Sequence, residues 1–374
     1  MRDSSLPPVL FPVRCLFLGY ISGPGRGIPN PLSQDAVQYD TCVEMNSRNG
    51  TFLRLIEESS LYQRSAVLLA AVELGVFDAL AAGPLQADEL AARLAASERG
   101  MSQLVNALVA LGWLELSQGR FSVPPEVAEL AGSGGDRSLA AILRHHAHLL
   151  RGWADLASRV RSGSVDSPPA RSADEHFAFL MAMDDLARHR ADLLWETVSL
   201  DGVSRLVDVG GGAGRFALEA ARRFPGLQAV VVDLPDSEPA FHKVTADTPE
   251  ASRVSFVAAD ALEGPLPAGD AALVSSLIHI YGPEELRNLA HNLAAALKPG
   301  GRLVIRDFFF ADPTHTAPLS TALFAINMLV HTQTGGCYTR AELESLFGPA
   351  GFGQWAFRPL DDRMSVLTGV RTHS

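Results

Sequence analysis

The segment that most constrains the fold is a run of glycines between a short apolar stretch and an amphipathic one. Residues 205–209 (Arg-Leu-Val-Asp-Val) have the pattern of a strand buried on both faces, and the loop 208–214 (Asp-Val-Gly-Gly-Gly-Ala-Gly) follows. A helix predicted over 215–224 and a second apolar strand at 228–232 complete a strand–loop–helix–strand unit. Glycines allow a ligand to approach the backbone, and the helix start supplies free N–H groups. The segment therefore predicts a parallel sheet with a ligand site at its carboxyl edge.

The remaining C-terminal half continues this alternation and then departs from it. Further strands are predicted at 254–258, 271–275 and 302–309, with a helix over 283–297. After a helical stretch at 339–350, two strands at 355–358 and 365–370 flank the pair Asp361-Asp362, which is typical of a hairpin. The predicted class is α/β, a Rossmann-like seven-stranded sheet that ends in an antiparallel hairpin.

The N-terminal half has helical periodicity instead. A helical run begins near Ser59 and closes at Gly75, and helices are predicted over 86–95 and 101–111. Two short strands around Gln118-Gly119 then form a small hairpin, which completes a winged-helix unit. Its second helix has no arginine or lysine facing a groove, so packing or dimerisation is favoured over DNA reading. A DNA-binding regulator stays as a distant alternative.

The chain of 374 residues is longer than one ordinary domain. We expect a disordered, proline-rich extension over 1–50, a winged-helix dimerisation domain over 51–160, a helical linker contributing to a substrate pocket over 161–200, and a catalytic domain over 201–374. A net charge of −11 argues against a nucleic-acid partner. No apolar run of about 18 residues is present, which argues against a membrane span. The three cysteines (Cys15, Cys42, Cys337) have neither disulfide nor metal-ligand spacing, so we expect a cytoplasmic protein without a metal.

Acidic residues mark the ends of three predicted strands. Asp208, Asp233 and Asp260 follow successive strands and so meet at one edge of the sheet. The loop itself fits two registers. Gly212-x-Gly214-x-x-Ala217 satisfies a loose nicotinamide pattern, whereas Asp208-x-Gly210-x-Gly212-x-Gly214 places an acid first.

Several segments together resemble one family. Residues 206–235 resemble the first motifs of S-adenosylmethionine-dependent small-molecule O-methyltransferases, a family that includes plant phenylpropanoid enzymes, acetylserotonin methyltransferase and bacterial polyketide methyltransferases. The resemblance continues in Leu297-Lys-Pro-Gly-Gly301, Asn327-Met-Leu329, Gly335-Gly336 and Ala350-Gly-Phe352. It extends over roughly residues 52–370, and the winged-helix front belongs to it as the dimerising part.

The resemblance implies a cofactor site for S-adenosylmethionine. Asp233 would take the ribose hydroxyls, Leu234 and Ala261 would pack against the adenine, and Asp260 would lie near its amino group. Ser275 or Ser276 stands where relatives have a lysine or arginine near the cofactor. The full predicted set is Asp208, Gly210, Gly212, Gly214, Asp233, Leu234, Asp260, Ala261 and Ser275.

The resemblance also implies a general base at His279, with Asp307 as its acidic partner. Ile280-Tyr281 replaces the Asp-Trp that follows the histidine in relatives, and the second acid expected near 335–339 is missing. Tyr281 or the acceptor's own acidity is therefore an alternative route for the proton. The predicted acceptor contacts are Phe179, Met183, Asn327 and Met328.

The function predicted is methyl transfer to a hydroxyl of a small aromatic or polyketide-like molecule, in secondary metabolism, by a homodimer formed through the N-terminal domain. Because methyl transfer to an activated sulfonium carbon gains much from orientation alone, an altered base site does not exclude activity. A C-methyltransferase, or a relative that keeps the cofactor for other chemistry, stays open as the alternative.

Overall fold

The computed structural model describes residues 48–163 and 171–372. The predictions made for 1–47 and for the Ser/Pro/Gly-rich segment at 164–170 lie outside these residues. The described residues divide between Ser60 and Leu61 into two units, and each is described by itself. In the first unit α2 (Arg48–Ser60) precedes the helix start predicted near Ser59. It exposes four large apolar side chains, Phe52, Leu53, Leu55 and Ile56.

The second unit begins with the winged-helix elements. Gly75, with a φ of 76°, ends one helix and starts the next. The loop between the two strands, at Gln118 and Gly119, has positive φ at both residues, as a tight hairpin turn requires. Phe77, Leu90, Met101 and Leu108 form the fully buried centre of this part. Its elements are α3 (Tyr62–Leu74), α4 (Val76–Ala81), α5 (Ala87–Arg93), α6 (Glu98–Ala110), β1 (Glu115–Ser117), β2 (Arg120–Ser122) and α7 (Pro125–Ala131).

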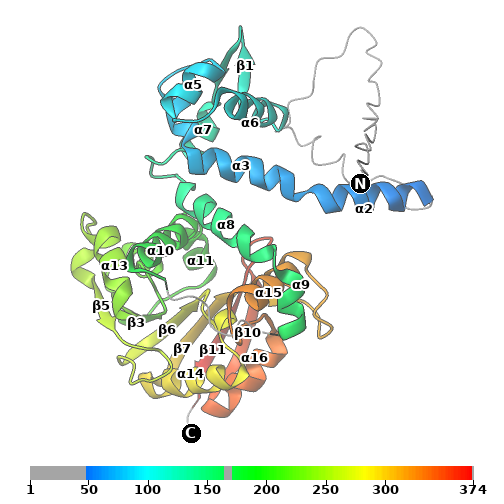
Figure 1. The fold of residues 1–374 in the computed structure, drawn as a ribbon. Helices are drawn as coiled ribbons and strands as arrows, with labels where there is room; N and C mark the ends of the chain where they lie inside the picture. Colours follow the sequence, from blue (N-terminus) through cyan, green and yellow to red (C-terminus); the bar gives the residue numbers. More distant parts are fainter. Residues whose placement is uncertain (1–47, 164–170, 373–374) are drawn as a thin grey trace, which may run out of the picture. The chain divides into compact units, whose positions relative to one another are not determined.

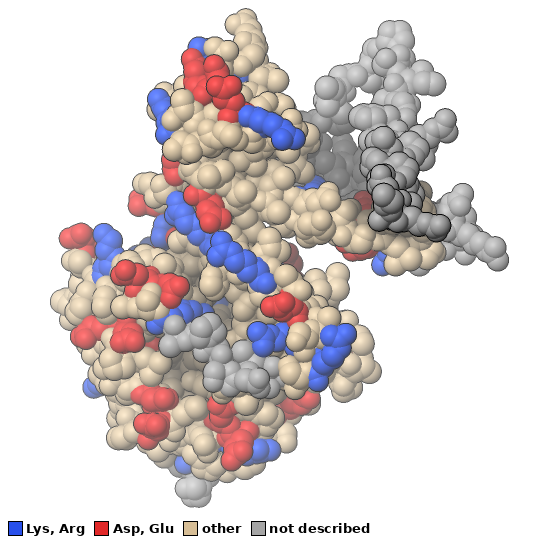
Figure 2. Space-filling view, viewed as in Figure 1, with Lys and Arg blue, Asp and Glu red and all other residues tan. Residues whose placement is uncertain are grey.

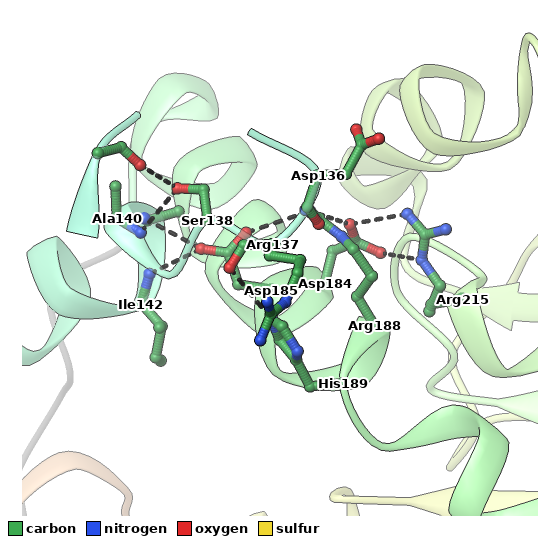
Figure 3. Close-up of polar contacts among 12 residues, drawn as sticks. Asp136, Arg137, Ser138, Ala140, Ile142, Asp184, Asp185, Arg188, His189 and Arg215 are labelled. Atoms are coloured by element: carbon green, nitrogen blue, oxygen red, sulfur yellow. Dashed lines mark hydrogen bonds and ion pairs between the residues drawn. The ribbon is translucent and has the colours of Figure 1, made fainter. Parts of the chain in front are cut away.

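Four helices lead from this part to the sheet: α8 (Ala140–Trp153), α9 (Leu156–Ser162), α10 (Ala173–Arg188) and α11 (Ala191–Thr197). A buried ionic network fixes α10 in place (Figure 3). Asp185 Oδ2 accepts from the backbone N–H groups of Ala141 and Ile142 at 3.0 and 3.2 Å, and so caps the start of α8. Asp184 accepts from both Arg188 and Arg215 at 2.8–3.0 Å, which ties α10 to the helix that follows the glycine loop.

The central sheet has seven strands in the order β10-β11-β7-β6-β3-β4-β5 (Figure 1). β7, β6, β3, β4 and β5 pair in parallel, while β11 pairs antiparallel with both β7 and β10. The predicted α/β class with a terminal antiparallel hairpin is confirmed. The strands are β3 (Arg205–Val209), β4 (Gln228–Asp233), β5 (Val254–Ala258), β6 (Gly269–Ser275), β7 (Leu297–Asp307), β10 (Phe352–Pro359) and β11 (Ser365–Arg371). The strand expected to run to Phe309 ends at Asp307, and β8 (Phe309–Phe310) pairs separately with β9 (Tyr338–Thr339).

Helices cover both faces, so alternate strand residues enter two different cores. Leu206, Val231 and Val304 pack with α11 and with α12 (Arg215–Arg223) on one face. Val207, Val232 and Ile305 pack on the other with α14 (Pro283–Ala296) and α16 (Arg340–Phe347). Full burial of each such side chain contributes about 1.5–3 kcal/mol. The remaining helices are α13 (Glu238–Thr245), α15 (Leu319–His331) and the short turns η2 (Pro235–Ser237), η3 (Ala251–Arg253), η4 (Ile278–Ile280) and η5 (Gly348–Ala350). In the described ranges no helix is long and apolar enough to cross a membrane.

Candidate active site

The glycine loop lies at the carboxyl end of β3, as predicted. Gly210 has a φ of +69°, and a Cβ there would lie 2.7 Å from the side chain of Leu277, so only glycine fits. The N–H of Gly212 donates to Asp233 Oδ2 at 2.7 Å, which joins the loop to the end of β4. Gly214 starts α12 and lies against Phe241, away from this edge contact.

Asp208 lies behind the loop rather than on its surface. The side chain is fully buried, and among the described residues neither of its carboxylate oxygens has a hydrogen-bond partner. Burial first, and then the charge of Asp233, raises the pKa of Asp208 to about 7. A Cβ on Gly211 would lie 2.7 Å from this carboxyl group. Asp208 therefore contacts the underside of the loop.

Asp233 organises the end of β4. Its Oδ1 accepts from the N–H of Leu234 and from the hydroxyl of Ser237, both at 2.8 Å. Together with the bond from Gly212, these contacts hold the carboxylate at the carboxyl edge of the sheet. Each oxygen of an ionised carboxylate can accept two hydrogen bonds, so further acceptor capacity is left for a ligand hydroxyl.

Asp260 follows β5 and accepts from the N–H of Leu262 at 2.8 Å, as a turn-capping aspartate does. The charges of Asp260 and Asp233 both raise the pKa of Tyr281, after burial, to about 12. The two predicted cofactor acids therefore lie in the same surroundings as Tyr281. Ala261 is buried in the core, whereas Leu234 is 49% exposed at this edge.

Ser275 ends β6 and receives an arginine from the neighbouring strand. The β6–β7 register pairs Ser275 with Arg306, whose Nη1 donates to the hydroxyls of Ser275 and Ser276 at 3.2 Å. Arg306 is buried over the ring of Phe216, and its Nε has no partner among the described residues. Burial lowers the pKa of Arg306 to about 10, so the group is still charged at neutral pH. Sequence reasoning did not single out this arginine.

Helix α10 covers the glycine loop. Leu180 packs with Ala213, and a Cβ on Gly212 would lie 3.2 Å from its side chain. One residue before it, Phe179 lies beside the ring of His145, with 5.3 Å between centroids. Met183 is half-buried one turn further on.

His279 and Asp307 are brought together as predicted. His279 Nδ1 lies 2.7 Å from Asp307 Oδ1, an oxygen that also accepts from the N–H of Phe308. Since an ionised carboxylate only accepts, Nδ1 carries the hydrogen and Nε2 is left with a free lone pair. Asp307 is completely buried, and His279 is 8% exposed.

Two aromatic rings stand beside this imidazole. Phe308 and Phe324 stack with centroids 3.9 Å apart, and Phe324 meets His279 edge-on at 4.9 Å. Phe324 comes from α15 and Phe308 follows β7, so only folding brings the pair together. The imidazole and the two rings form a surface suited to a flat aromatic molecule.

The place of the missing second acid is taken by a thiol and by backbone. Cys337 is buried, and burial together with the charge of Asp307 raises the pKa of its thiol to about 12. The N–H of Gly336 donates to the backbone oxygen of His279 at 2.9 Å, and a Cβ on Gly335 would lie 2.4 Å from that oxygen. The absence of a side chain at Gly335 therefore allows the chain to pass directly against the backbone of His279. Tyr281, whose pKa is raised to about 12, is protonated at neutral pH.

The two predicted acceptor residues of α15 have different surroundings. Asn327 accepts a hydrogen bond from the indole N–H of Trp153 at 3.1 Å, which joins α15 to the end of α8. Met328 is buried, 6% exposed. The basic side chains near α8 were also missed by sequence reasoning, although the pattern His145-His146-x-His148 was a signal available to it.

Comparison with known proteins covers both halves of the chain. A family model described as the O-methyltransferase domain matches residues 161–353, and a second, the O-methyltransferase dimerisation domain, matches residues 57–128.

The matches with individual relatives extend over most of each relative's length. The chain is 33% identical to the 3-hydroxy-5-methyl-1-naphthoate 3-O-methyltransferase of Streptomyces sahachiroi over 77% of this chain and 86% of the relative. It is 31% identical to the tetracenomycin polyketide synthesis 8-O-methyl transferase of Streptomyces glaucescens, over 85% and 94%. The fold matches the crystal structure of human N-acetylserotonin methyltransferase in complex with S-adenosylmethionine, with a TM-score of 0.80, 24% identity, and coverage of 89% and 100%.

Proposed function

Because the chain belongs to the family of S-adenosylmethionine-dependent O-methyltransferases, we propose that it methylates a phenolic hydroxyl of an aromatic, polyketide-type small molecule. The observation that carries this proposal is the 2.7 Å contact of His279 with Asp307 beside the stacked rings of Phe308 and Phe324. The printed names of two relatives, which act on a naphthoate and a tetracenomycin polyketide, support the acceptor class.

The cofactor, when bound, supplies a methyl group on a sulfonium carbon. The donor set at the carboxyl edge fits such a ligand, because the carboxylate of Asp233 beside the glycine loop can still accept a hydrogen bond from a ribose hydroxyl. We assign Gly210, Gly212 and Asp233 to its amino-acid and ribose ends, with Asp260, Leu234 and Ala261 around its adenine. Gly214 and Asp208 support the loop from behind.

Arg306 extends this assignment. Ser275 offers only a neutral hydroxyl, but the guanidinium of Arg306 is held against it. We assign to Arg306 the positive charge that complements the carboxylate of the cofactor. The desolvated position makes such a charge-assisted contact strong.

His279 acts in this proposal as the general base. Its Nε2 accepts the phenolic proton as the oxygen attacks, and Asp307 stabilises the imidazolium that forms. Phe179, Met183, Asn327 and Met328 are assigned to the acceptor pocket, with Phe308 and Phe324 added as the rings that orient it. Orientation alone contributes roughly 7–11 kcal/mol to such displacements.

We further propose a cytoplasmic homodimer formed through the N-terminal domain. The dimerisation-domain match and the exposed apolar residues of α2 (Phe52, Leu53, Leu55, Ile56) support it. Light scattering of the full chain at micromolar concentration should report the mass of a dimer. Replacing Leu55 and Ile56 by glutamate should yield a monomer, and a wild-type monomer would contradict the proposal.

The function is tested by incubating the protein with methyl-labelled S-adenosylmethionine and a panel of naphthols, hydroxynaphthoates and anthraquinone phenols. We expect label on oxygen, located by mass spectrometry and NMR. Label on carbon would instead favour the C-methyltransferase, which the missing second acid keeps as a second candidate.

A further inference from the structure

The side chains that surround the proposed acceptor pocket are basic, in a chain whose net charge is −11. Arg171 lies over the ring of Phe179, with its Cζ 4.1 Å from the centroid. Arg363 lies 5.7 Å from the centroid of Phe308, which itself stacks on Phe324 beside His279. Two arginines that are distant in sequence therefore stand on aromatic rings, one on a predicted acceptor residue and the other on a ring near His279.

Helix α8 adds a row of imidazoles. The rings of His145 and His146 have centroids 6.4 Å apart, and His145 also meets Phe179. His331, at the end of α15, lies close enough that a Cβ on Gly152 of α8 would be 2.6 Å from its Nε2. In Figure 2 basic side chains lie close together across the middle of the visible face, with acidic side chains beside them.

These cations lack the carboxylate partners that other arginines have. Nine arginines in the described chain form ion pairs with acids, among them Arg188, Arg190 and Arg215. Arg171 and Arg363 form none with any described residue, although the charge of Glu175, which caps the start of α10, reaches Arg171.

Arg159 of α9 also forms no ion pair with a described residue. Its Nε is buried and has no partner among the described residues. The charges of Arg159 and Arg171 both act on His331, which places the two arginines around the same imidazole.

Neighbouring positive charge adds to burial in lowering the pKa values of the histidines. Burial, followed by His146, Arg171, His148 and His331, lowers the pKa of His145 to about 4. Burial and then the charge of Arg363 lower the pKa of His146. Burial lowers the pKa of His331, with Arg171 and Arg159 among the further causes. Every charged group that acts on these three rings is itself a cation or an imidazole.

A metal site does not account for the cluster. Among residues 48–163 and 171–372, no three histidine, cysteine, aspartate or glutamate side chains converge as ligands of a metal ion would. Guanidinium groups that stand on aromatic rings and form no ion pair with a described residue instead match a planar carboxylate, which a guanidinium binds through two parallel hydrogen bonds.

We propose that the methyl acceptor is an aromatic hydroxy acid, and that Arg171 and Arg363 recognise its anionic group beside the imidazoles of His145 and His146. This inference rests on the proposed function, since it assumes that the pocket beside His279 takes the acceptor.

The test measures binding without methyl transfer. The full-length protein, saturated with S-adenosylhomocysteine, is titrated calorimetrically with matched acid and amide pairs of one-, two- and three-ring hydroxyaromatics, such as 6-hydroxy-2-naphthoate and 6-hydroxy-2-naphthamide. We expect at least one acid to bind about tenfold or more tightly than its amide, as a charge-assisted pair provides.

Variants then assign the preference to residues. Arg171→Gln and Arg363→Gln should each reduce it severalfold, and the double variant should abolish it, whereas Arg171→Lys should keep most of it. Arg287→Gln removes a charge from an exposed position on α14 and should change nothing.

The inference is overturned if no acid in the panel binds more tightly than its amide, or if the double variant keeps the preference. Failure of the proposed function has a different signature. In that case an acid binds through the two arginines, yet no phenol in the panel is methylated.

Discussion

The two sides of the proposed active site are opposite in charge and in construction. The proposed cofactor edge carries Asp208, Asp233 and Asp260, each at or near the end of a neighbouring parallel strand and all within one stretch of sequence. The proposed acceptor side carries Arg171, Arg363 and several histidines, which come from α8, α15, the start of α10 and the β10–β11 turn. An acidic edge suits a sulfonium donor, and a basic wall suits an oxygen nucleophile that loses a proton. The acidic side is therefore formed by residues that follow one another along the sequence at strand ends. The basic side is formed by residues from separate elements that only the packing of helices brings together.

Replacing the proposed base should have the largest effect. His279→Ala should lower kcat by about 10²–10⁴-fold, because no other base replaces Nε2. Binding of S-adenosylhomocysteine should be unchanged, since His279 is assigned to the acceptor and not to the cofactor. Steady-state kinetics and calorimetry measure the two quantities separately.

Asp307→Asn is the matched control and should cost less, because it only weakens the orientation and charge stabilisation of the imidazole. A loss below about fivefold for His279→Ala would make the histidine a structural residue. Pure orientation, or methylation at carbon, would then be the better account.

The buried carboxyl of Asp208 gives a pH-dependent prediction for the acidic edge. The folded protein keeps its proton up to about pH 7, whereas the unfolded chain loses it near pH 4. The stabilisation from this proton is therefore complete below pH 4 and is lost as the pH rises through 7. Relative to Asp208→Asn, the wild type should lose roughly 2–3 kcal/mol of unfolding free energy between pH 5 and 8. Urea denaturation at four pH values measures this difference, and parallel curves for the two proteins would refute it.

Asp233→Ala should weaken the binding of S-adenosylhomocysteine without weakening the binding of an aromatic acid. It removes a carboxylate that holds Gly212, Leu234 and Ser237, and that we assign to the ribose. The dissociation constant for S-adenosylhomocysteine should rise by about 10–100-fold. Binding of an aromatic acid to the free protein should be nearly unchanged. Equal losses for both ligands would show that the sides are one coupled unit.

The smallest effect is expected at Asp260. An asparagine keeps an oxygen for the N–H of Leu262, so Asp260→Asn preserves the turn while removing the charge. Affinity for S-adenosylhomocysteine should fall by roughly three- to tenfold, as one weakened hydrogen bond predicts. No change in calorimetric affinity would make Asp260 a turn cap only.

Local sequence was enough to predict the glycine loop and the acids at strand ends, because strand ends are marked by the change from apolar residues to glycine or aspartate. The pair His279–Asp307 was predicted only from the resemblance to the family. Helix α2 was not predicted, because its exposed Phe52, Leu53, Leu55 and Ile56 do not give the periodicity of a helix that buries one face of a single chain.

The sequence by itself determined the α/β class, the terminal hairpin and the acidic edge of the sheet. The spacing of apolar residues and the residue types at strand ends are local properties of the chain. Only the tertiary structure decided that Arg306 donates to the hydroxyl of Ser275, since that depends on the register of β7 against β6. It also decided that Phe324 and Phe308 stack beside His279, and that Arg171 and Arg363 stand on the rings of Phe179 and Phe308. Contacts of this kind join residues far apart along the chain, and no spacing in the sequence encodes the packing of helices that brings them together.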